Sequence, residues 1–345
     1  MRVNRNQLIP KKDYFAFLEK EEHENIFTKC QVEMFKKVYQ ENKYLLNHHS
    51  KKNHFISHFF QILQKDKTNQ ILARFYILLL YVVSRKYAFQ TIRYIQKNKN
   101  ITDREVIQYL YQANTEEKKE GIHEIYKLNP CSRKIYMFQL MYQKYKDIFP
   151  QTNKKPSYLD IGCGDGYKTI ALSKAFRIPM KNTYGTDIQS WGPYQKRNLN
   201  FNFKHISSNG TLPYEDKSFD IISIFLTLHH IEDLDKTCRE IRRILKPTGV
   251  LLILEHDCMN EYDYLIINIQ HMFFHYMMTM KNSPDEWKNK NYIEQPIYSN
   301  YLNRAEWNFI LSKHGFQFIN GNDIGDSTMK VTYDNQYFAF YKMIQ

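Results

Sequence analysis

The first 150 residues carry apolar side chains at helical spacing. The two clearest runs are Val32, Phe35, Val38 and Tyr39, and then Phe55, Phe59, Phe60 and Leu63. Such spacing places apolar side chains on one face of an α-helix. Glycine, which weakens helices, occurs only at Gly121 before Gly162. The pattern predicts a helical N-terminal domain over residues 1–150, followed by a second domain over residues 151–345 after the polar segment from Pro150 to Pro156.

From Ser157 onward, short apolar runs alternate with helical patterns. The runs at 157–162, 183–188, 203–208, 219–228 and 250–257 predict strands, and those at 167–176, 233–247 and 304–316 predict helices. Residues 219–228 are almost entirely apolar, as in a strand that is covered on both faces. Alternating strands and helices indicate an α/β fold with a doubly wound, mostly parallel sheet. Residues 334–344 predict a final edge strand, and residues 266–280 predict an amphipathic or buried helix after the fifth strand.

A glycine-rich turn follows the first predicted strand. Gly162, Gly164 and Gly166 alternate with other residues, which lets the backbone turn tightly and approach a ligand closely. Asp187 ends the next predicted strand, at the spacing after the last glycine at which a carboxylate binds a ribose diol. The two elements together predict a site for an adenosine-type ligand.

The glycine turn and two later segments resemble class I S-adenosylmethionine-dependent methyltransferases. Asp160 stands two residues before the first glycine, as in the motif (E/D)xGxGxG of that family. The segments LPYEDKSFDIISIFLTLHHIED and LKPTGVLLILEHD look like the later motifs of its ubiquinone and menaquinone methyltransferase subfamily. The resemblance implies a Rossmann-like fold and S-adenosyl-L-methionine as the cofactor.

The resemblance also implies a set of cofactor-binding residues. Asp160 is expected near the ammonium group, the three glycines form the floor of the site, and Asp187 binds the ribose hydroxyls. Ile188 is expected against the adenine ring and Phe225 beside the methionine moiety. Ser208 and Asn209 occupy the place of the aspartate that the family commonly directs at the adenine amino group, and either could form that hydrogen bond.

Two adjacent histidines follow the fourth predicted strand. His229 and His230 occupy the place where this family faces its substrate, so we predict them as catalytic residues. An imidazole there could act as a general base near neutral pH. The alternative is a structural role in the loop. Glu255-His256-Asp257 ends the fifth strand, where either an acid-base role or helix capping by Asp257 is open.

Histidine spacing also raises the question of a metal. The pairs His54 and His58, and His271 and His275, have the four-residue spacing that places two ligands on one helix face. Neither pair has a third ligand at recognisable spacing, and HExxH is absent. We therefore expect no metal. The five cysteines form no CxxC pair, which disfavours a zinc ribbon and fits a reducing intracellular, cytoplasmic location.

The positive charge is concentrated in the predicted N-terminal domain. Residues 1–150 contain 27 basic and 15 acidic side chains, and residues 51–100 contain 10 and 1. Lys86, Arg93 and Lys97 fall on one face of a predicted helix over residues 84–97. This asymmetry favours RNA or another polyanion as a partner, or merely keeps a helical domain in solution.

Three functions stay open at this stage. The basic face favours a methyltransferase that acts on RNA, whereas the subfamily resemblance favours a small-molecule acceptor. A cofactor-binding scaffold subunit without activity is the third. No stretch has the roughly 20 uninterrupted apolar residues of a membrane span, since the longest, Ile71 to Val83, contains Arg74 and predicts a buried helix.

Overall fold

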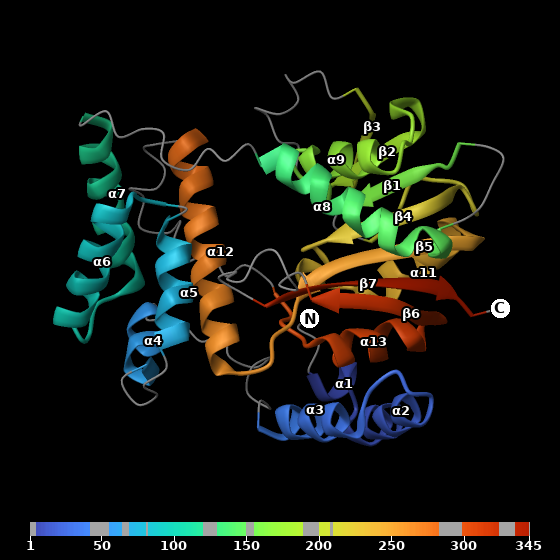
Figure 1. Cartoon of the computed structure of the whole chain (residues 1–345), viewed down its shortest axis with the longest axis horizontal. Helices are drawn as coiled ribbons and strands as arrows, with labels where there is room; N and C mark the ends of the chain where they lie inside the picture. Colours follow the sequence, from blue (N-terminus) through green and yellow to red (C-terminus); the bar gives the residue numbers. More distant parts are fainter. Residues whose placement is uncertain are drawn as a thin grey trace.

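A computed structural model of the whole chain describes most of its residues (Figure 1). The described residues are 5–41, 55–63, 69–80, 82–119, 130–149, 155–188, 200–207, 210–282, 299–323 and 335–344.

A seven-stranded sheet forms the centre of the molecule, in the order β3-β2-β1-β4-β5-β7-β6. The strands are β1 (Tyr158–Ile161), β2 (Thr183–Asp187), β3 (Asn202–His205), β4 (Phe219–Phe225), β5 (Leu245–His256), β6 (Phe316–Asp323) and β7 (Gln336–Met343). The first five are parallel to one another, and β7 is antiparallel to both β5 and β6. This order confirms the predicted Rossmann-like, doubly wound and mostly parallel sheet.

The last strand corrects one prediction. Residues 334–344 were expected at an edge, but β7 pairs on both sides and β6 forms the edge. The apolar side chains of β7 are consistent with its inner position, since Ala339, Phe340 and Tyr341 are all fully buried. The strand β6 was not predicted from the sequence. Its residues, FQFINGND, end in glycine and polar residues, which are uncommon in strands.

The helices before the sheet are α1 (Arg5–Leu8), α2 (Lys11–His23), α3 (Lys29–Glu41), α4 (Phe55–Leu63), α5 (Asn69–Leu80), α6 (Arg85–Lys97), α7 (Asp103–Lys119) and α8 (Pro130–Tyr145). Within and after it come α9 (Tyr167–Ala175), α11 (Leu234–Ile244), α12 (Glu261–Asn282) and α13 (Arg304–Lys313), with short 3-10 turns η1 (Lys146–Ile148), η2 (Met180–Asn182) and η3 (Leu228–His230). The start of α13 has a capping box between Asn303 and Glu306, which satisfies backbone N–H groups in its first turn.

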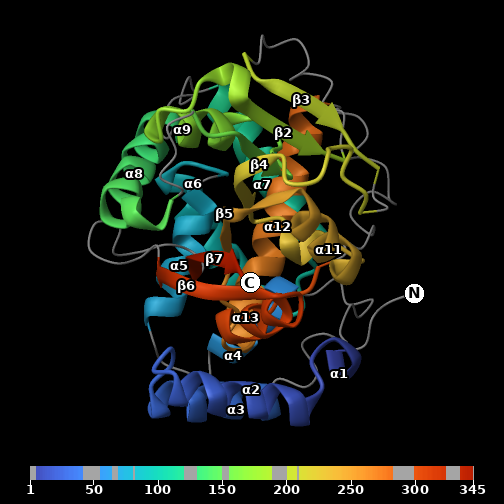
Figure 2. The same ribbon diagram turned by 90° about the vertical axis from the view of Figure 1, so that its right-hand side faces the viewer.

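Side chains alternate between the two faces of the sheet, and a separate group of helices covers each face. On one face, residues such as Tyr158, Ile221 and Leu252 pack against α8 and α9. On the other, residues such as Leu159 and Leu251 pack with α11 and α13, and α2 and α3 lie beyond α13 (Figure 2). The rings of Tyr14 on α2 and Phe309 on α13 meet edge to face, with 5.6 Å between their centroids.

The helices α4 to α7 form a further layer that packs against α12 rather than on the sheet (Figure 1). The ring centroids of Phe75 on α5 and Phe273 on α12 are 6.4 Å apart. Arg74 Nη1 also donates to the buried carboxylate of Asp263 on α12, at 3.1 Å. Each of the three buried clusters contains residues from both sides of residue 150. The domain division into 1–150 and 151–345 stays a prediction.

The apolar segment from Ile71 to Val83 largely forms α5, as the buried-helix prediction expected. Phe75 and Leu79 on this helix are fully buried. Among the described helices, none combines the length and the hydropathy that crossing a membrane requires.

Glu21 near the end of α2 is a buried carboxyl group whose ionisation should oppose folding. Burial is the main cause that raises its pKa from 4.5 to about 7, and the negative charge of Glu24 adds to the effect. Between pH 4.5 and about 7, the folded chain therefore keeps the Glu21 proton that the unfolded chain has released. The stability contributed by this group is full below pH 4.5 and is lost as pH rises through about 7.

We expect Glu21→Gln to flatten this pH dependence. Between about pH 5 and about pH 8, the Tm of the wild type should fall by more than that of the variant. Glu33→Gln, at an exposed position of α3, is the matched control and should follow the wild type. Parallel curves for the wild type and Glu21→Gln would show that Glu21 does not titrate in this range.

Candidate functional site

The glycine turn between β1 and α9 is held against the end of β2. Gly162, Gly164 and Gly166 have φ angles of +71°, +52° and +74°, a left-handed conformation that favours glycine. The N–H groups of Gly162 and Cys163 both donate to the carbonyl oxygen of Thr186. The N–H of Gly164 donates to Asp187 Oδ2 at 2.9 Å. These bonds bring the turn and Asp187 together, as the sequence spacing predicted for one ligand site.

The first two glycines of the turn have different surroundings. A Cβ added at Gly162 would lie 2.3 Å from Thr227 Cγ2, so this glycine allows the end of β4 to pack closely on the turn. A Cβ at Gly164 would meet no heavy atom within 4 Å among the described residues other than its chain neighbours. Gly164 therefore borders open space, as expected of the residue beneath a ligand. Gly166 immediately precedes α9.

Asp160 lies below the turn, at the centre of the sheet. Its carboxylate accepts hydrogen bonds from Thr169 Oγ1 at 2.6 Å and from Ser223 Oγ at 2.7 Å. Burial raises its pKa to about 6 against the opposing effect of these two bonds. The bonds connect β1, α9 and β4, which gives Asp160 a role in positioning the turn. Its predicted proximity to the ammonium group of the cofactor stays a prediction.

The predicted adenosine side of the site lies at the end of β2. Asp187 is buried, whereas the side chain of Ile188 next to it is 53% exposed. An exposed apolar side chain at this position fits the predicted contact with an adenine ring. Ser208 and Asn209, predicted to meet the adenine amino group, lie outside the described residues.

The end of β4 departs from regular strand geometry. Phe225 is buried and its ring stacks on Phe138 of α8, so its side chain belongs to the core on that face. Leu226 then has a φ of +54°, which is rare for a bulky residue and costs free energy. This bend places Thr227 against the glycine turn, where its Oγ1 donates to the Phe225 carbonyl oxygen at 3.1 Å. The predicted place of Phe225 beside the methionine moiety stays a prediction.

Glu255 near the end of β5 connects this bend to a group of histidines. Its Oε1 accepts from the backbone N–H of Thr227 at 3.0 Å, and its Oε2 lies 2.7 Å from His229 Nδ1. His229 Nε2 lies 3.3 Å from His271 Nε2, and His271 Nδ1 lies 2.8 Å from Tyr301 Oη. A continuous chain of polar contacts therefore runs from the glycine turn to α12.

Burial keeps the two contacting histidines neutral. His229 is 1% exposed, and burial is the main cause that holds its pKa well below the ordinary value of 6.5. The pKa of His271 is lowered well below that value for the same reason, with His229 and two further histidines adding to the effect. His230 is less buried, and its Nδ1 lies 3.3 Å from Ser299 Oγ. The catalytic roles predicted for His229 and His230 stay predictions.

The two acidic residues at the end of β5 have different partners. Asp257 accepts from the backbone N–H of Arg304 at 2.9 Å and from its guanidinium Nε at 2.7 Å. Arg304 is the first residue of α13, so Asp257 satisfies a backbone donor at the start of that helix, as one of the two sequence interpretations expected. Glu255 instead faces the histidines.

Sequence reasoning did not assign site roles to Thr227, His271 and Tyr301. No sequence motif marks the bend at Leu226, so nothing in the sequence indicated that Thr227 packs against Gly162. His271 was noticed only as one half of a pair with His275, because its contacts come from elements 42 and 30 residues away in sequence. Tyr301 is one of 27 tyrosines and has no distinguishing neighbours.

The contrast between Gly162 and Gly164 generates a stability test. Both Gly→Ala changes place a Cβ in the left-handed region, which costs ~1 to 2 kcal/mol. Only Gly162→Ala adds a collision with Thr227, so it should lose a further ~1 to 3 kcal/mol of unfolding free energy. Urea unfolding without cofactor measures both, with Gly164→Ala as the matched control. Equal losses would contradict the close packing of Thr227 on Gly162.

The chain was compared with known families and curated proteins. Residues 133–320, more than half of the chain, match the family described as "Methyltransferase domain". Demethylmenaquinone methyltransferase from Lactobacillus johnsonii is 36% identical over 110 residues, which cover 28% of this chain and 42% of that protein. The enzyme of the same description from a Geobacillus species is 28% identical over 154 residues, covering 42% of this chain and 65% of that protein. The chain thus spans less than two thirds of the length of these relatives.

Solved structures to which the chain is similar include the YcgJ protein of Bacillus subtilis, at 17% identity and a TM-score of 0.40 over 61% of this chain and 98% of that one. A protein described as a SAM-dependent methyltransferase, from Aquifex aeolicus, is 18% identical with a TM-score of 0.39 over 59% of this chain and 88% of that one. The family match confirms the resemblance found in the sequence and, with it, S-adenosylmethionine as the cofactor. Because the match covers more than half of its length, the chain belongs to the methyltransferase-domain family.

Proposed function

We propose that this chain transfers a methyl group from S-adenosylmethionine to a small-molecule acceptor. The observation that carries the proposal is the arrangement at one edge of the sheet. Gly164 borders open space beside Asp187. The chain of contacts through Thr227, Glu255 and His229 lies at the carboxyl ends of β4 and β5. The carboxyl ends of parallel strands form one edge, where α/β proteins bind their ligands.

The residues at the glycine turn fit the cofactor. The open space beside Gly164 would take the ligand at close backbone contact, and the Asp187 carboxylate beside it would accept hydrogen bonds from the two ribose hydroxyls. Ile188 would cover one face of the adenine. When bound, S-adenosylmethionine supplies a methyl group that its sulfonium already activates, so the chain's residues chiefly have to align the acceptor.

The acceptor side would be formed by η3, the end of β5 and α12. His229 offers a neutral imidazole whose orientation Glu255 holds, and His230 stands next to it at the edge of the buried group. His230 could accept a proton from a hydroxyl or carbon acid of the acceptor, because both ring nitrogens of His229 already face other side chains. The burial of His229 and its contact with α12 favour a compact acceptor over a polymer.

The curated relatives support the same choice. Two of them are described as demethylmenaquinone methyltransferases, a description that names demethylmenaquinone, and not a polymer, as the acceptor. By analogy we assign the chain a small-molecule acceptor methylated at carbon, oxygen or nitrogen. A noncatalytic scaffold role is one alternative, and it predicts cofactor binding without turnover.

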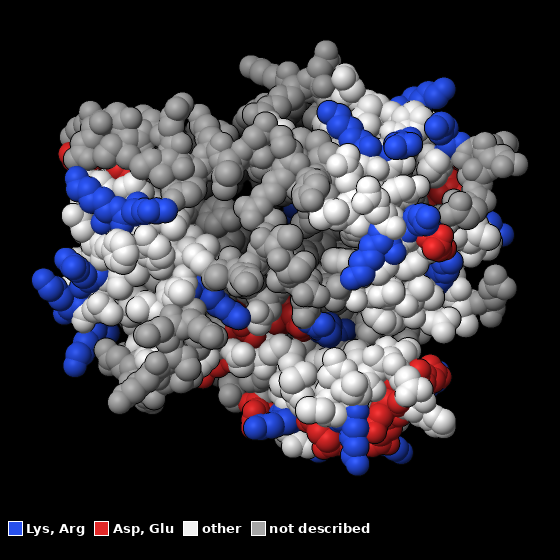
Figure 3. All heavy atoms as spheres, in the orientation of Figure 1, with Lys and Arg blue, Asp and Glu red and all other residues white. Residues whose placement is uncertain are grey.

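RNA is the second candidate substrate, favoured by the surface of α6. Lys86, Arg93 and Lys97 are exposed on it, while Ala88, Ile92 and Ile95 on the opposite face are buried. Lys and Arg side chains also gather over this part of the molecule in the space-filling view (Figure 3). This layer packs on α12 and not on the glycine turn, so the basic face is a weaker guide to the acceptor than the site itself.

Replacing Asp187 with Ala should weaken cofactor binding. The change removes two charge-assisted hydrogen bonds to the ribose, each worth ~1.5 to 3 kcal/mol, so the Kd for S-adenosylmethionine should rise at least about tenfold. Calorimetry on the purified chain measures this. Asp216→Ala, an exposed carboxylate paired with Arg243, is the matched control and should bind as the wild type does. Undiminished affinity in Asp187→Ala would remove this residue from the cofactor site.

Label from the methyl group of S-adenosylmethionine should appear in the small-molecule fraction of a cell extract. The extract is incubated with wild type or with Asp187→Ala as the blank, and then divided into small molecules, RNA and protein. Label in RNA would overturn the proposal, above all if RNA binding falls with salt and is lost when Lys86, Arg93 and Lys97 are neutralised. Cofactor binding without label in any fraction would instead indicate a scaffold.

A further inference from the structure

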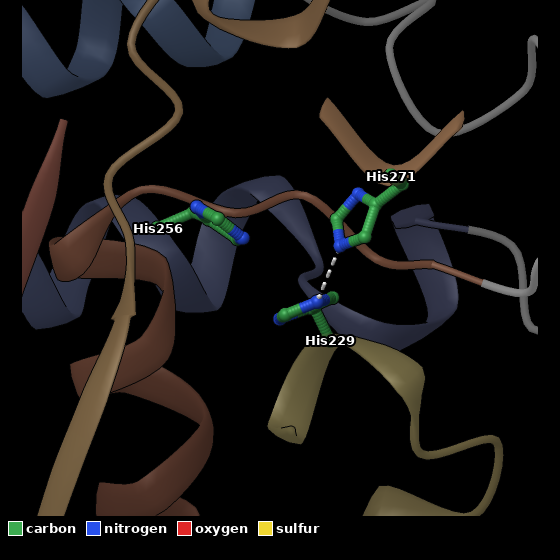
Figure 4. Close-up of side chains that lie close together, drawn as sticks. All are labelled: His229, His256 and His271. Atoms are coloured by element: carbon green, nitrogen blue, oxygen red, sulfur yellow. Dashed lines mark hydrogen bonds between the residues drawn. The ribbon is translucent and has the colours of Figure 1, made fainter. Parts of the chain in front are cut away.

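Three histidines from distant parts of the chain meet beside the proposed acceptor site. His229 comes from η3, His256 is the last residue of β5, and His271 lies on α12 (Figure 4). One ring nitrogen of each lies within 4.8 Å of the others, the only such group of three metal-ligating side chains found among the described residues. His229 and His256 are buried, at 1% and 2% exposure. We propose that these three side chains bind a zinc ion.

The spacing of two of these nitrogens fits a shared metal. Zinc binds histidine nitrogen at about 2.0 to 2.1 Å with tetrahedral geometry, which separates two ligand nitrogens by roughly 3.3 Å. His229 Nε2 and His271 Nε2 are 3.3 Å apart and face each other (Figure 4). One ring nitrogen of His256 lies within 4.8 Å of those of the other two histidines, which makes it the third donor of the group.

The protons on the rings also fit a cation. Glu255 accepts from the backbone N–H groups of Thr227 and His256 and faces His229 Nδ1. Burial raises the pKa of Glu255, and the N–H of His256 opposes that effect. With its proton on Nδ1, toward this carboxylate, His229 would turn the Nε2 lone pair toward His271. If His271 likewise donates from Nδ1 to Tyr301 Oη, two lone pairs oppose each other at 3.3 Å, and a cation between them would relieve their repulsion.

The neighbours of the three rings resemble the supporting shell of a metal site. Ligating histidines commonly donate their second ring N–H to a carboxylate or another oxygen, which fixes the ring and makes the ligand more basic. Glu255 Oε2 lies 2.7 Å from His229 Nδ1 and Tyr301 Oη lies 2.8 Å from His271 Nδ1, so each of these two rings has an oxygen beside its second nitrogen. The rings of His271 and Tyr301 also stack, with 12° between their planes.

Three protein ligands leave one position of a tetrahedral zinc ion for water or for a donor atom of a substrate. The site would lie at the end of the contact chain that begins at Gly162, on the acceptor side of the cofactor turn. Zinc binding does not depend on the proposed methyl transfer, and the experiment reads metal binding directly. Failure of the zinc site would therefore leave the proposed function untouched.

The test measures zinc binding by the full chain, prepared without a histidine tag and stripped with a chelator. Titration of ZnCl2 against a chromophoric chelator should give one tightly bound equivalent for the wild type. His256→Ala and His271→Ala should each weaken the affinity about 100-fold or more. His314→Ala is the matched control, because this histidine also contacts a carboxylate, Asp235 at 2.9 Å, but lies outside the group. It should bind zinc as the wild type does.

Two further measurements guard against variants that fold poorly. Zinc should raise the Tm of the wild type and of His314→Ala, since a ligand that binds only the folded chain stabilises it. It should leave the Tm of the two cluster variants unchanged, whatever their starting value. Cobalt in place of zinc should give the intense visible absorption of a tetrahedral site in the wild type. No tight equivalent in the wild type, or equal binding by the cluster variants, would overturn the proposal.

Discussion

A carboxylate buried in a protein has to receive hydrogen bonds, because its transfer from water otherwise costs far more free energy than folding can supply. Glu255 is completely buried at the end of β5, and burial raises its pKa. It accepts from the backbone N–H groups of Thr227 and His256 and faces the ring of His229. These contacts fix the bend after β4 relative to the end of β5. Most of the candidate site depends on that bend.

The constraint extends to the cofactor side through Thr227. Its side chain packs where a Cβ of residue 162 would stand, so the shape of the glycine turn and the bend after β4 are fitted to each other. Leu226 takes a left-handed conformation to make this possible, and the surrounding hydrogen bonds offset the strain. The turn that borders the cofactor space and the histidines on the acceptor side therefore form one connected structure.

The helices α4 to α7 affect the same site indirectly, because they pack against α12. This helix contributes His271 to the histidine group and also packs against α4 and α5, with an ion pair between Asp263 and Arg74. Residues from the first half of the chain thus hold in place a helix that borders the proposed acceptor site. This packing supports a role for these helices in shaping the acceptor site more directly than it supports a role in recognising a polymer.

Local patterns in the sequence determined the strands β1 to β5, the glycine turn and the proximity of Asp187. They did so because strand periodicity, glycine conformation and the length of a strand-helix unit are properties of neighbouring residues. The pairing of β7 between β5 and β6 was missed, since strand partners depend on contacts between segments far apart. The buried face of α6 was also predicted, because helical periodicity is likewise a property of neighbouring residues.

Only the tertiary structure decided which side chains surround the site beyond the glycine turn. His229, His256 and His271 belong to three elements with no shared spacing, and their meeting depends on how α12 packs against the ends of β4 and β5. Gly162 and Gly164 look alike in sequence, yet one packs on Thr227 and the other borders open space. The sequence by itself determined the glycine turn, because the conformation of a turn is local. The fold decided the histidine group, because its members are brought together by long-range packing alone.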